Sequence, residues 1–193
     1  PLHAIASYER ELGLPPNAIN RVVSSTAPKG AWSRLERGEI SMLEFFDGFE
    51  QDCEGAGWKI SAREMMERIG ETSKPRPIML EAIRRIREQG LHVAALTNNW
   101  APEGDVESSK NPLAALFHVF VESSVEGLRK PDPRIYELVC DRLAVGPEEA
   151  VFLDDIGANL KPARAMGMTT LKVENPESTL KELTEILGFP LTA

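Results

Sequence analysis

Residues 151–164 read VFLDDIGANLKPAR. The apolar run from Ala150 to Leu153 is short enough to predict a buried strand rather than a helix. Two carboxylates, Asp154 and Asp155, follow it directly, and a helix is expected from Gly157 to Met166. Neighbouring carboxylates at the end of an apolar strand are costly to bury unless a cation or strong hydrogen-bond donors offset their charge. The pair therefore favours an oxygen-rich site of the kind that suits Mg²⁺, although one or both residues could instead cap the helix.

Strands and helices alternate through the second part of the chain. Further apolar runs at residues 91–96, 117–121 and 169–173 predict three more strands. Apolar residues at helical spacing predict helices between them, beginning at Pro77. This order indicates an α/β fold with a Rossmann-like, mostly parallel sheet covered by helices on both faces. Ligand sites in such sheets lie at the carboxyl ends of the strands, so the polar residues at those ends are the candidates for chemistry.

The first seventy-odd residues predict helices only. Ser41 with Glu44, and Ser61 with Glu64, have the spacing of capping boxes ahead of apolar helical runs. The stretch from Lys74 to Pro77 reads KPRP, a stiff connector that ends helices. We therefore expect an all-helical cap over residues 1–75 and an α/β core over residues 76–193.

Two other predicted strand ends carry polar residues. Thr97 and Asn98 follow the first strand, where a hydroxyl and backbone N–H groups could cradle an anion, or could form an ordinary polar turn. Lys130 precedes Pro131 and Pro133, which stiffen the backbone around it, and it could neutralise a phosphate and a neighbouring carboxylate. It could equally be a solvated lysine ahead of a helix that Asp132 caps. After the third strand, Asn159 could hydrogen-bond a carboxylate.

Composition excludes several classes of protein. The formal net charge of -8 over 193 residues argues against general nucleic-acid binding, which usually needs a basic face. It does not exclude a phosphorylated substrate, because a few local cations can outweigh a distant negative surface. No apolar run has membrane-spanning length, and Cys53 and Cys140 lack metal-like spacing. We expect two free, buried thiols in a cytoplasmic protein.

The order of these strand-end groups resembles that of the haloacid-dehalogenase superfamily of hydrolases. Thr-Asn, then Lys-Pro, then Asp-Asp at successive strand ends match that family's second, third and fourth motifs. Residues 151–164 resemble most closely the N-terminal phosphatase domain of soluble epoxide hydrolases, and similar domains occur fused to acyl-CoA dehydrogenase-like proteins. The resemblance spans nearly the whole chain and is strongest from Leu96 to Met168.

The resemblance implies a role for each residue of the candidate site. Thr97 and Asn98 would hold a phosphate oxygen, and Lys130 would stabilise the nucleophile and the transferring phosphoryl group. Asp155 would bind Mg²⁺ directly. Asp154 would assist through a bridging water or by contacting the groups that bind the metal. In the helical cap, a recurring family segment is matched by Arg34, Leu35, Gly38, Glu39 and Ile40. Its Arg34 could reach the substrate or form a surface ion pair.

The resemblance also implies a nucleophile that the sequence does not contain. The family uses an aspartate at the end of its first core strand, with a second aspartate two residues later as acid and base. No Asp-x-Asp pair follows an apolar run here. We expect that segment to precede Pro1, on a strand that lies at the centre of the sheet.

The resulting hypothesis is a hydrolase, a Mg²⁺-dependent phosphatase that acts on a small phosphorylated metabolite or lipid through an aspartyl-phosphate, provided that the nucleophile segment exists. One alternative is a haloacid dehalogenase, which uses a similar aspartate without a metal. Another is a non-catalytic domain of the same fold. A homodimer, or fusion to a further C-terminal domain, remains open, and no nucleic-acid or membrane partner is expected.

Overall fold

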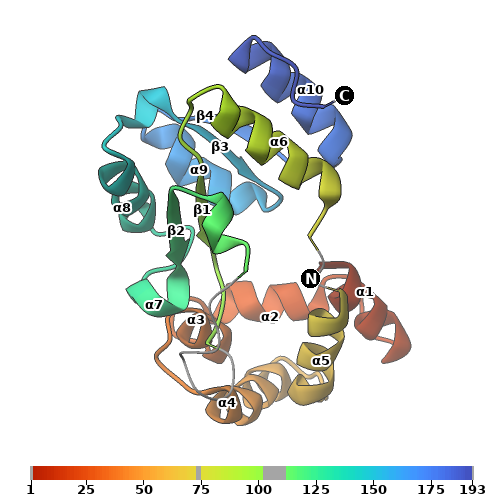
Figure 1. The fold of residues 1–193 in the computed structure, drawn as a ribbon. Helices are drawn as coiled ribbons and strands as arrows, with labels where there is room; N and C mark the ends of the chain where they lie inside the picture. Colours follow the sequence, from red (N-terminus) through yellow and green to blue (C-terminus); the bar gives the residue numbers. More distant parts are fainter. Residues whose placement is uncertain (1, 73–74, 102–111, 193) are drawn as a thin grey trace.

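The computed structural model describes residues 2–72, 75–101 and 112–192. Figure 1 shows the first five helices gathered in the lower part of the molecule, with the strands and the later helices above them. The lower helices are α1 (Leu2–Glu11), α2 (Ala18–Thr26), α3 (Ala31–Glu36), α4 (Met42–Gly55) and α5 (Ala62–Thr72). The upper helices are α6 (Pro77–Glu88), α7 (Ser123–Glu126), α8 (Pro133–Leu143), α9 (Gly157–Ala165) and α10 (Pro176–Leu187).

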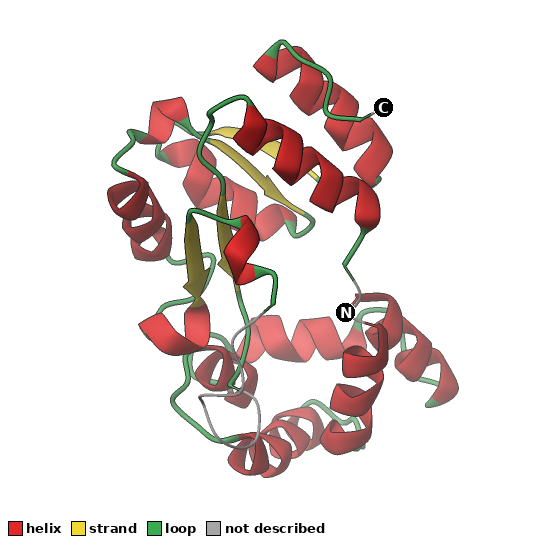
Figure 2. Cartoon of the chain, in the orientation of Figure 1, coloured by secondary structure: helices red, strands yellow, loops and turns green. Residues whose placement is uncertain are grey.

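Four short strands form two parallel ladders. β1 (Ala94–Thr97) pairs with β2 (Val119–Glu122), and β3 (Val151–Asp154) pairs with β4 (Thr169–Lys172). All of them lie in the upper part, as Figure 2 shows, and short 3₁₀ turns precede β2 and β3. The predicted α/β class with parallel pairing is confirmed. The strands of the described residues form two separate sheets of two, however, and not one continuous sheet.

The strands are less covered than parallel strands usually are. Every residue of β1 is only half-buried, and so are the first three residues of β3. Parallel sheets ordinarily have both faces covered by helices and both edges of their inner strands paired. Within the described part of the chain, β1 and β3 each pair along one edge only. Both strands therefore keep a main-chain edge that could receive another strand.

Helices cover the ladders from several sides. α8 and α9 pack on the strands around a buried cluster that includes Val121, Ile135 and Tyr136. α6 and α10 lie side by side in Figure 1 and share a second cluster with Leu171 of β4. α8 and α9 thus pack on strands next to them in the chain, whereas α6 packs with α10 over β3 and β4, which are distant from it in sequence.

The lower helices have an apolar core of their own. The fully buried rings of Phe45 and Phe49 stack 5.3 Å apart, and Trp32 packs edge-on against both. Apart from Trp100, every member of this cluster comes from residues 4–69. The aromatic residues of this region therefore contribute mainly to its own core.

The structure differs from the sequence predictions at the start of a strand, at a short helix and at a helix cap. The first strand begins at Ala94 and not at residue 91, because Gly90 and Leu91 belong to the turn that ends α6. No pattern in the sequence predicted α7, a single helical turn directly after β2. Ser61 caps α5 through its hydroxyl, but its N–H donates to Tyr8 Oη at 2.9 Å instead of to Glu64, so only half of that capping box forms.

Both cysteines are free and buried, as expected. Among the described residues, none of the helices combines the length and the apolar character needed to cross a membrane.

Candidate active site at the strand ends

Lys130 joins the ends of the two ladders. It follows α7 in the loop before α8, and only 9% of its surface is exposed. Its Nζ donates to the carbonyl oxygen of Leu96 at 2.8 Å and to Asp154 Oδ2 at 2.7 Å. These acceptors lie on β1 and β3. A cation therefore bridges the carboxyl ends of two strands that do not pair with each other.

Asp154 is buried and fully occupied by donors. Its Oδ1 accepts the backbone N–H of Ile156 at 2.7 Å and Asn159 Nδ2 at 3.0 Å, while Oδ2 faces Lys130. The expected hydrogen bond from Asn159 to a carboxylate is thus confirmed. Tyr136 Oη donates to the carbonyl of Asn159 at 2.7 Å. Burial, and next the charge of Asp154, raise the pKa of Tyr136, so its hydroxyl stays a donor over the whole physiological range.

Asp155 differs from Asp154 in its exposure to solvent and in its contacts. Its side chain is exposed, and its carboxylate has no hydrogen bond or ion pair among the residues that the structure describes. An exposed carboxylate beside a buried one offers the one or two oxygen ligands that Mg²⁺ takes while it keeps several waters. In the described part of the chain, no group of three or more His, Cys, Asp or Glu residues forms a closed metal site. The donors present therefore fit an open magnesium site and not a caged one.

Thr97 and Asn98 lie at the end of β1, next to the carbonyl that Lys130 contacts. The Thr97 hydroxyl makes only a long contact of 3.4 Å with the carbonyl of Asn98, so it remains available to a ligand. The Asn98 side chain is already engaged. Its Oδ1 accepts the Lys130 N–H at 2.8 Å, and its Nδ2 donates to the Lys130 carbonyl at 3.0 Å. Asn98 could therefore serve a ligand through its backbone N–H and not through its amide.

Arg34 is not brought to this cluster by any contact among the described residues. Nearly half of its side chain is exposed, and it forms an ion pair with Glu39 at 3.8 Å. Of the two roles expected for Arg34, the structure favours the surface ion pair.

Two residues beside the site gave no separate signal in the sequence. Arg129 precedes Lys130, and its Nε donates to Glu36 Oε2 at 2.5 Å. Glu36 belongs to α3 and is 6% exposed. The two residues are 93 positions apart, so only the fold could reveal their contact. The signal available was that Glu36 lies between Leu35 and Gly38, two residues that carry the family resemblance.

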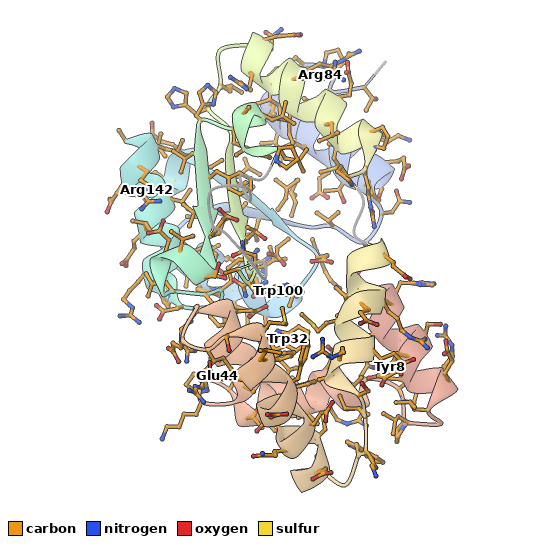
Figure 3. The ribbon with its side chains drawn as sticks, turned by 60° about the horizontal axis from the view of Figure 1, so that its bottom comes forward. Tyr8, Trp32, Glu44, Arg84, Trp100 and Arg142 are labelled. Carbon is orange, nitrogen blue, oxygen red and sulfur yellow. The ribbon has the colours of Figure 1, made fainter. Side chains whose placement is uncertain are left out.

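The loop after β1 connects the strands to the lower helices. Asn99 accepts a hydrogen bond from Ser123 Oγ and donates its own N–H to that oxygen at 2.9 Å. Trp100 then packs edge-on against Trp32, with their rings 6.3 Å apart. Figure 3 shows these two labelled rings close together where the helices meet the strands. The strand-end site is therefore adjacent to an aromatic face of the helical region.

Comparison with known proteins gives consistent matches. A family model described as a haloacid dehalogenase-like hydrolase matches residues 3–167. Acyl-CoA dehydrogenase family member 10 of Mus musculus is 38% identical over 188 residues, which cover 95% of this chain and 17% of that protein. Bifunctional epoxide hydrolase 2 of Sus scrofa is 32% identical over 198 residues, covering 96% of this chain and 36% of that protein. The chain thus spans well under half the length of these two relatives.

Two further matches resemble the chain over most of their length. Sesquiterpene phosphatase astK of Aspergillus oryzae is 28% identical over 157 residues, which cover 81% of this chain and 79% of that protein. A HAD family enzyme from Bacteroides thetaiotaomicron, solved in complex with magnesium and inorganic phosphate, has a TM-score of 0.56 and 22% identity, with 80% of each chain covered. At that identity the structural match shows a shared fold.

Proposed function

The chain belongs to the haloacid dehalogenase-like hydrolase family, and on this basis we propose that it is the phosphatase part of a Mg²⁺-dependent enzyme that acts on small phosphomonoesters. The contact of Lys130 with both Leu96 and Asp154 carries this proposal. A buried cation at the ends of two strands neutralises negative charge that a phosphoryl group brings. Similarity to the Aspergillus relative, a sesquiterpene phosphatase, supports the same reaction.

Each residue of the site has a separate task in this reaction. The Thr97 hydroxyl and the Asn98 N–H hold a phosphoryl oxygen, because both lie at the end of β1 beside the lysine. Lys130 stabilises charge on the transferring group. The Asn98 amide and Asp154 hold the lysine in place and do not touch the substrate.

The nucleophile comes from a further strand. β1 and β3 each have an unpaired edge in the described residues, and Lys130 spans their ends. A strand inserted between them would complete a continuous parallel sheet and present an aspartate to the lysine. Its carboxylate oxygen bonds to phosphorus while the bond from phosphorus to the alcohol oxygen breaks, and the alcohol leaves with a proton from the second aspartate. Water then attacks phosphorus and gives a proton to the second aspartate, the bond from phosphorus to the first aspartate's oxygen breaks, and phosphate leaves.

Magnesium is held by Asp155, with Asp154 as its neighbour. The exposed carboxylate of Asp155 has no competing partner in the described part of the chain, and the buried Asp154 is already committed to Lys130 and Asn159. Asp155 would hold the ion together with oxygen ligands from outside the described residues. Bound there, Mg²⁺ supplies positive charge that orients and polarises the phosphoryl group.

The lower helices act as the cap. Residues 1–75 have a separate apolar core, and their aromatic face meets the strand-end loop at Trp100. We assign them the role of closing over the substrate and excluding water. Residues 76–193 form the core that carries the catalytic groups.

The test is a phosphate-release assay with the protein in its full natural length. With p-nitrophenyl phosphate as substrate, we expect hydrolysis that needs added Mg²⁺ and stops on addition of a chelator. Lys130→Met is expected to lower kcat by roughly 100-fold or more, because one preorganised charge contact to the transition state is lost.

Two results would overturn the proposal. Release of halide from a 2-haloacid that persists in chelator would identify a dehalogenase. Binding of Mg²⁺ and inorganic phosphate without turnover of either substrate would identify a non-catalytic domain of the same fold.

A further inference from the structure

An ion pair between Arg129 and Glu36 links the cap to the loop that carries Lys130. Arg129 Nε donates to Glu36 Oε2 at 2.5 Å, and its Nη1 donates to Ser33 Oγ at 3.1 Å. Glu36 and Ser33 lie on α3 and are 6% and 1% exposed. The guanidinium group therefore fixes α3 at two points, with a geometry that a lysine could not reproduce.

Asn98 extends this link to Lys130. Its Nδ2 lies 3.4 Å from Glu36 Oε2 and donates to the Lys130 carbonyl at 3.0 Å. The Lys130 N–H returns a bond to Asn98 Oδ1 at 2.8 Å. Arg129 and Lys130, which are adjacent in one loop, are thus held by a connected set of polar groups that ends at the Glu36 carboxylate of the cap.

The backbone around this link is closely packed. Gly38 has a φ of +67°, and a Cβ placed there would lie 2.3 Å from the carbonyl oxygen of Ser124 in α7. The cap segment that follows α3 therefore contacts the core at a distance that only glycine permits. Since α3 and α7 also pack against each other, Glu36 has little freedom to move relative to Arg129.

Burying this pair needs a reason other than stability. Removing two charges from water costs about as much as their attraction returns, and an apolar pair of similar size could replace them. Buried polar groups are instead suited to fixing one arrangement out of several. Here the arrangement that they fix is that of the lysine loop relative to the cap.

We propose that Glu36 is a positioning residue, which holds Arg129 and Asn98 and so sets the position from which Lys130 reaches Asp154. This inference rests on the proposed phosphatase function, which gives Lys130 its catalytic role. In this arrangement the placement of the lysine depends on the cap. When α3 lies against the core, the loop that carries Lys130 is held. When α3 moves away, Arg129 and Asn98 lose their contacts with Glu36.

The experiment compares Glu36→Gln with a matched control, Glu126→Gln, in the full-length protein. Glu126 also accepts two bonds from an arginine, Arg142, at 2.7 and 2.8 Å, but among the described residues this pair joins α7 to α8 and has no hydrogen bond to Lys130 or Asn98. In Glu36→Gln we expect kcat to fall roughly 10- to 100-fold, because a small displacement of a catalytic group is enough for that loss. KM should change less than about two-fold, and Glu126→Gln should keep both constants.

A second measurement does not depend on activity. Amide hydrogen exchange at Lys130 should become faster in Glu36→Gln, because its N–H donates to Asn98, and should not change in Glu126→Gln. If the wild-type protein hydrolyses no phosphomonoester, the proposed function fails, while the exchange rates still decide whether the cap holds the loop.

Equal exchange at Lys130 in both variants, or a KM effect without a kcat effect, would overturn the inference. If Glu36→Gln does not fold, Arg129→Lys keeps the positive charge but loses the forked contact to Ser33 and Glu36. The same exchange and kcat readouts then decide the question.

Discussion

Asp154 and Asp155 show how strongly one position along a strand changes a side chain's environment. Successive strand residues point to opposite sides, so the last residue of β3 faces Lys130 and Asn159 while the next one faces solvent. The sequence indicated that a cation or strong donors must offset this pair of charges. It could not say that Lys130 and Asn159 serve one carboxylate and leave the other open, because that division depends on side-chain directions.

The Asn159 amide is suited to a test of the buried carboxylate. In Asn159→Asp a second carboxylate of nearly the same shape would face Asp154, whose surface is 7% exposed. We expect a loss of about 2 kcal/mol in the free energy of unfolding at pH 7, from the lost donor and the repulsion. The introduced carboxyl has a raised pKa in the folded state, so the loss should shrink as the pH falls.

Asn175→Asp is the control for that substitution. Asn175 caps α10 through a bond from the Ser178 N–H at 2.9 Å, and aspartate caps helices as well as asparagine does. Urea unfolding of the two variants compares them directly. Equal stabilities would mean that Asp154 is not held as a buried anion.

Cys53 tests burial at a single residue. Its thiol is fully buried, and burial, together with the nearby charges of Asp52 and Glu50, raises its pKa to about 12. In a Cys140→Ala background, we expect Cys53 in the native protein to react with a thiol reagent at pH 8 no faster than the protein unfolds. The raised pKa stabilises the fold fully below the ordinary thiol value of 9.0, and this contribution is lost as the pH rises from there toward 12. Rapid labelling of Cys53 at pH 8 would contradict its placement in the core.

At the scale of elements, the helix starts were the most predictable features, because their signals are local. The Ser41 and Glu44 box forms as expected, with both reciprocal bonds present. The Ser61 and Glu64 box forms only in part, because Tyr8 from α1 takes the place of the glutamate at the Ser61 N–H. That substitution of partners comes from a residue 53 positions away, which a local pattern cannot contain.

This difference leads to a comparison of two serine variants. Ser41→Ala should lower the free energy of unfolding by about 1 kcal/mol, because the cap of α4 loses its acceptor. Ser61→Ala should cost less, because the Ser61 N–H keeps its bond to Tyr8, whereas the Ser41 hydroxyl also donates to Glu44 Oε2 at 2.8 Å. Thermal unfolding of both variants measures the order, and a larger effect for Ser61→Ala would contradict it.

The strands were predicted in number and order but not in length. Apolar runs identify where a chain can be buried, while the ladder begins only where backbone partners are in register. The run at residues 91–96 therefore includes a turn, and α7 was missed because a single helical turn has no periodicity to detect.

For the whole molecule, the sequence predicted the family, the α/β class and an exclusively helical first part. The family is confirmed by the match over residues 3–167. The contacts that join the two parts could not be predicted, because Glu36 with Arg129 and Trp32 with Trp100 each connect residues more than sixty positions apart. The strands β1 and β3 are largely half-buried. They are consistent with the proposed central strand that would pair with β1 and β3.

The most direct test of the proposed active site is the Mg²⁺ dependence of phosphomonoester hydrolysis in Asp155→Asn compared with the wild type. Asp155 is exposed and has no partner among the described residues, so the substitution should leave the melting temperature unchanged. We expect half-maximal activity to need at least about ten times more Mg²⁺, or activity to be lost, because a ligand to the metal is gone. Wild-type activity with an unchanged Mg²⁺ dependence would contradict the assignment of the metal and phosphate site to the ends of β1 and β3.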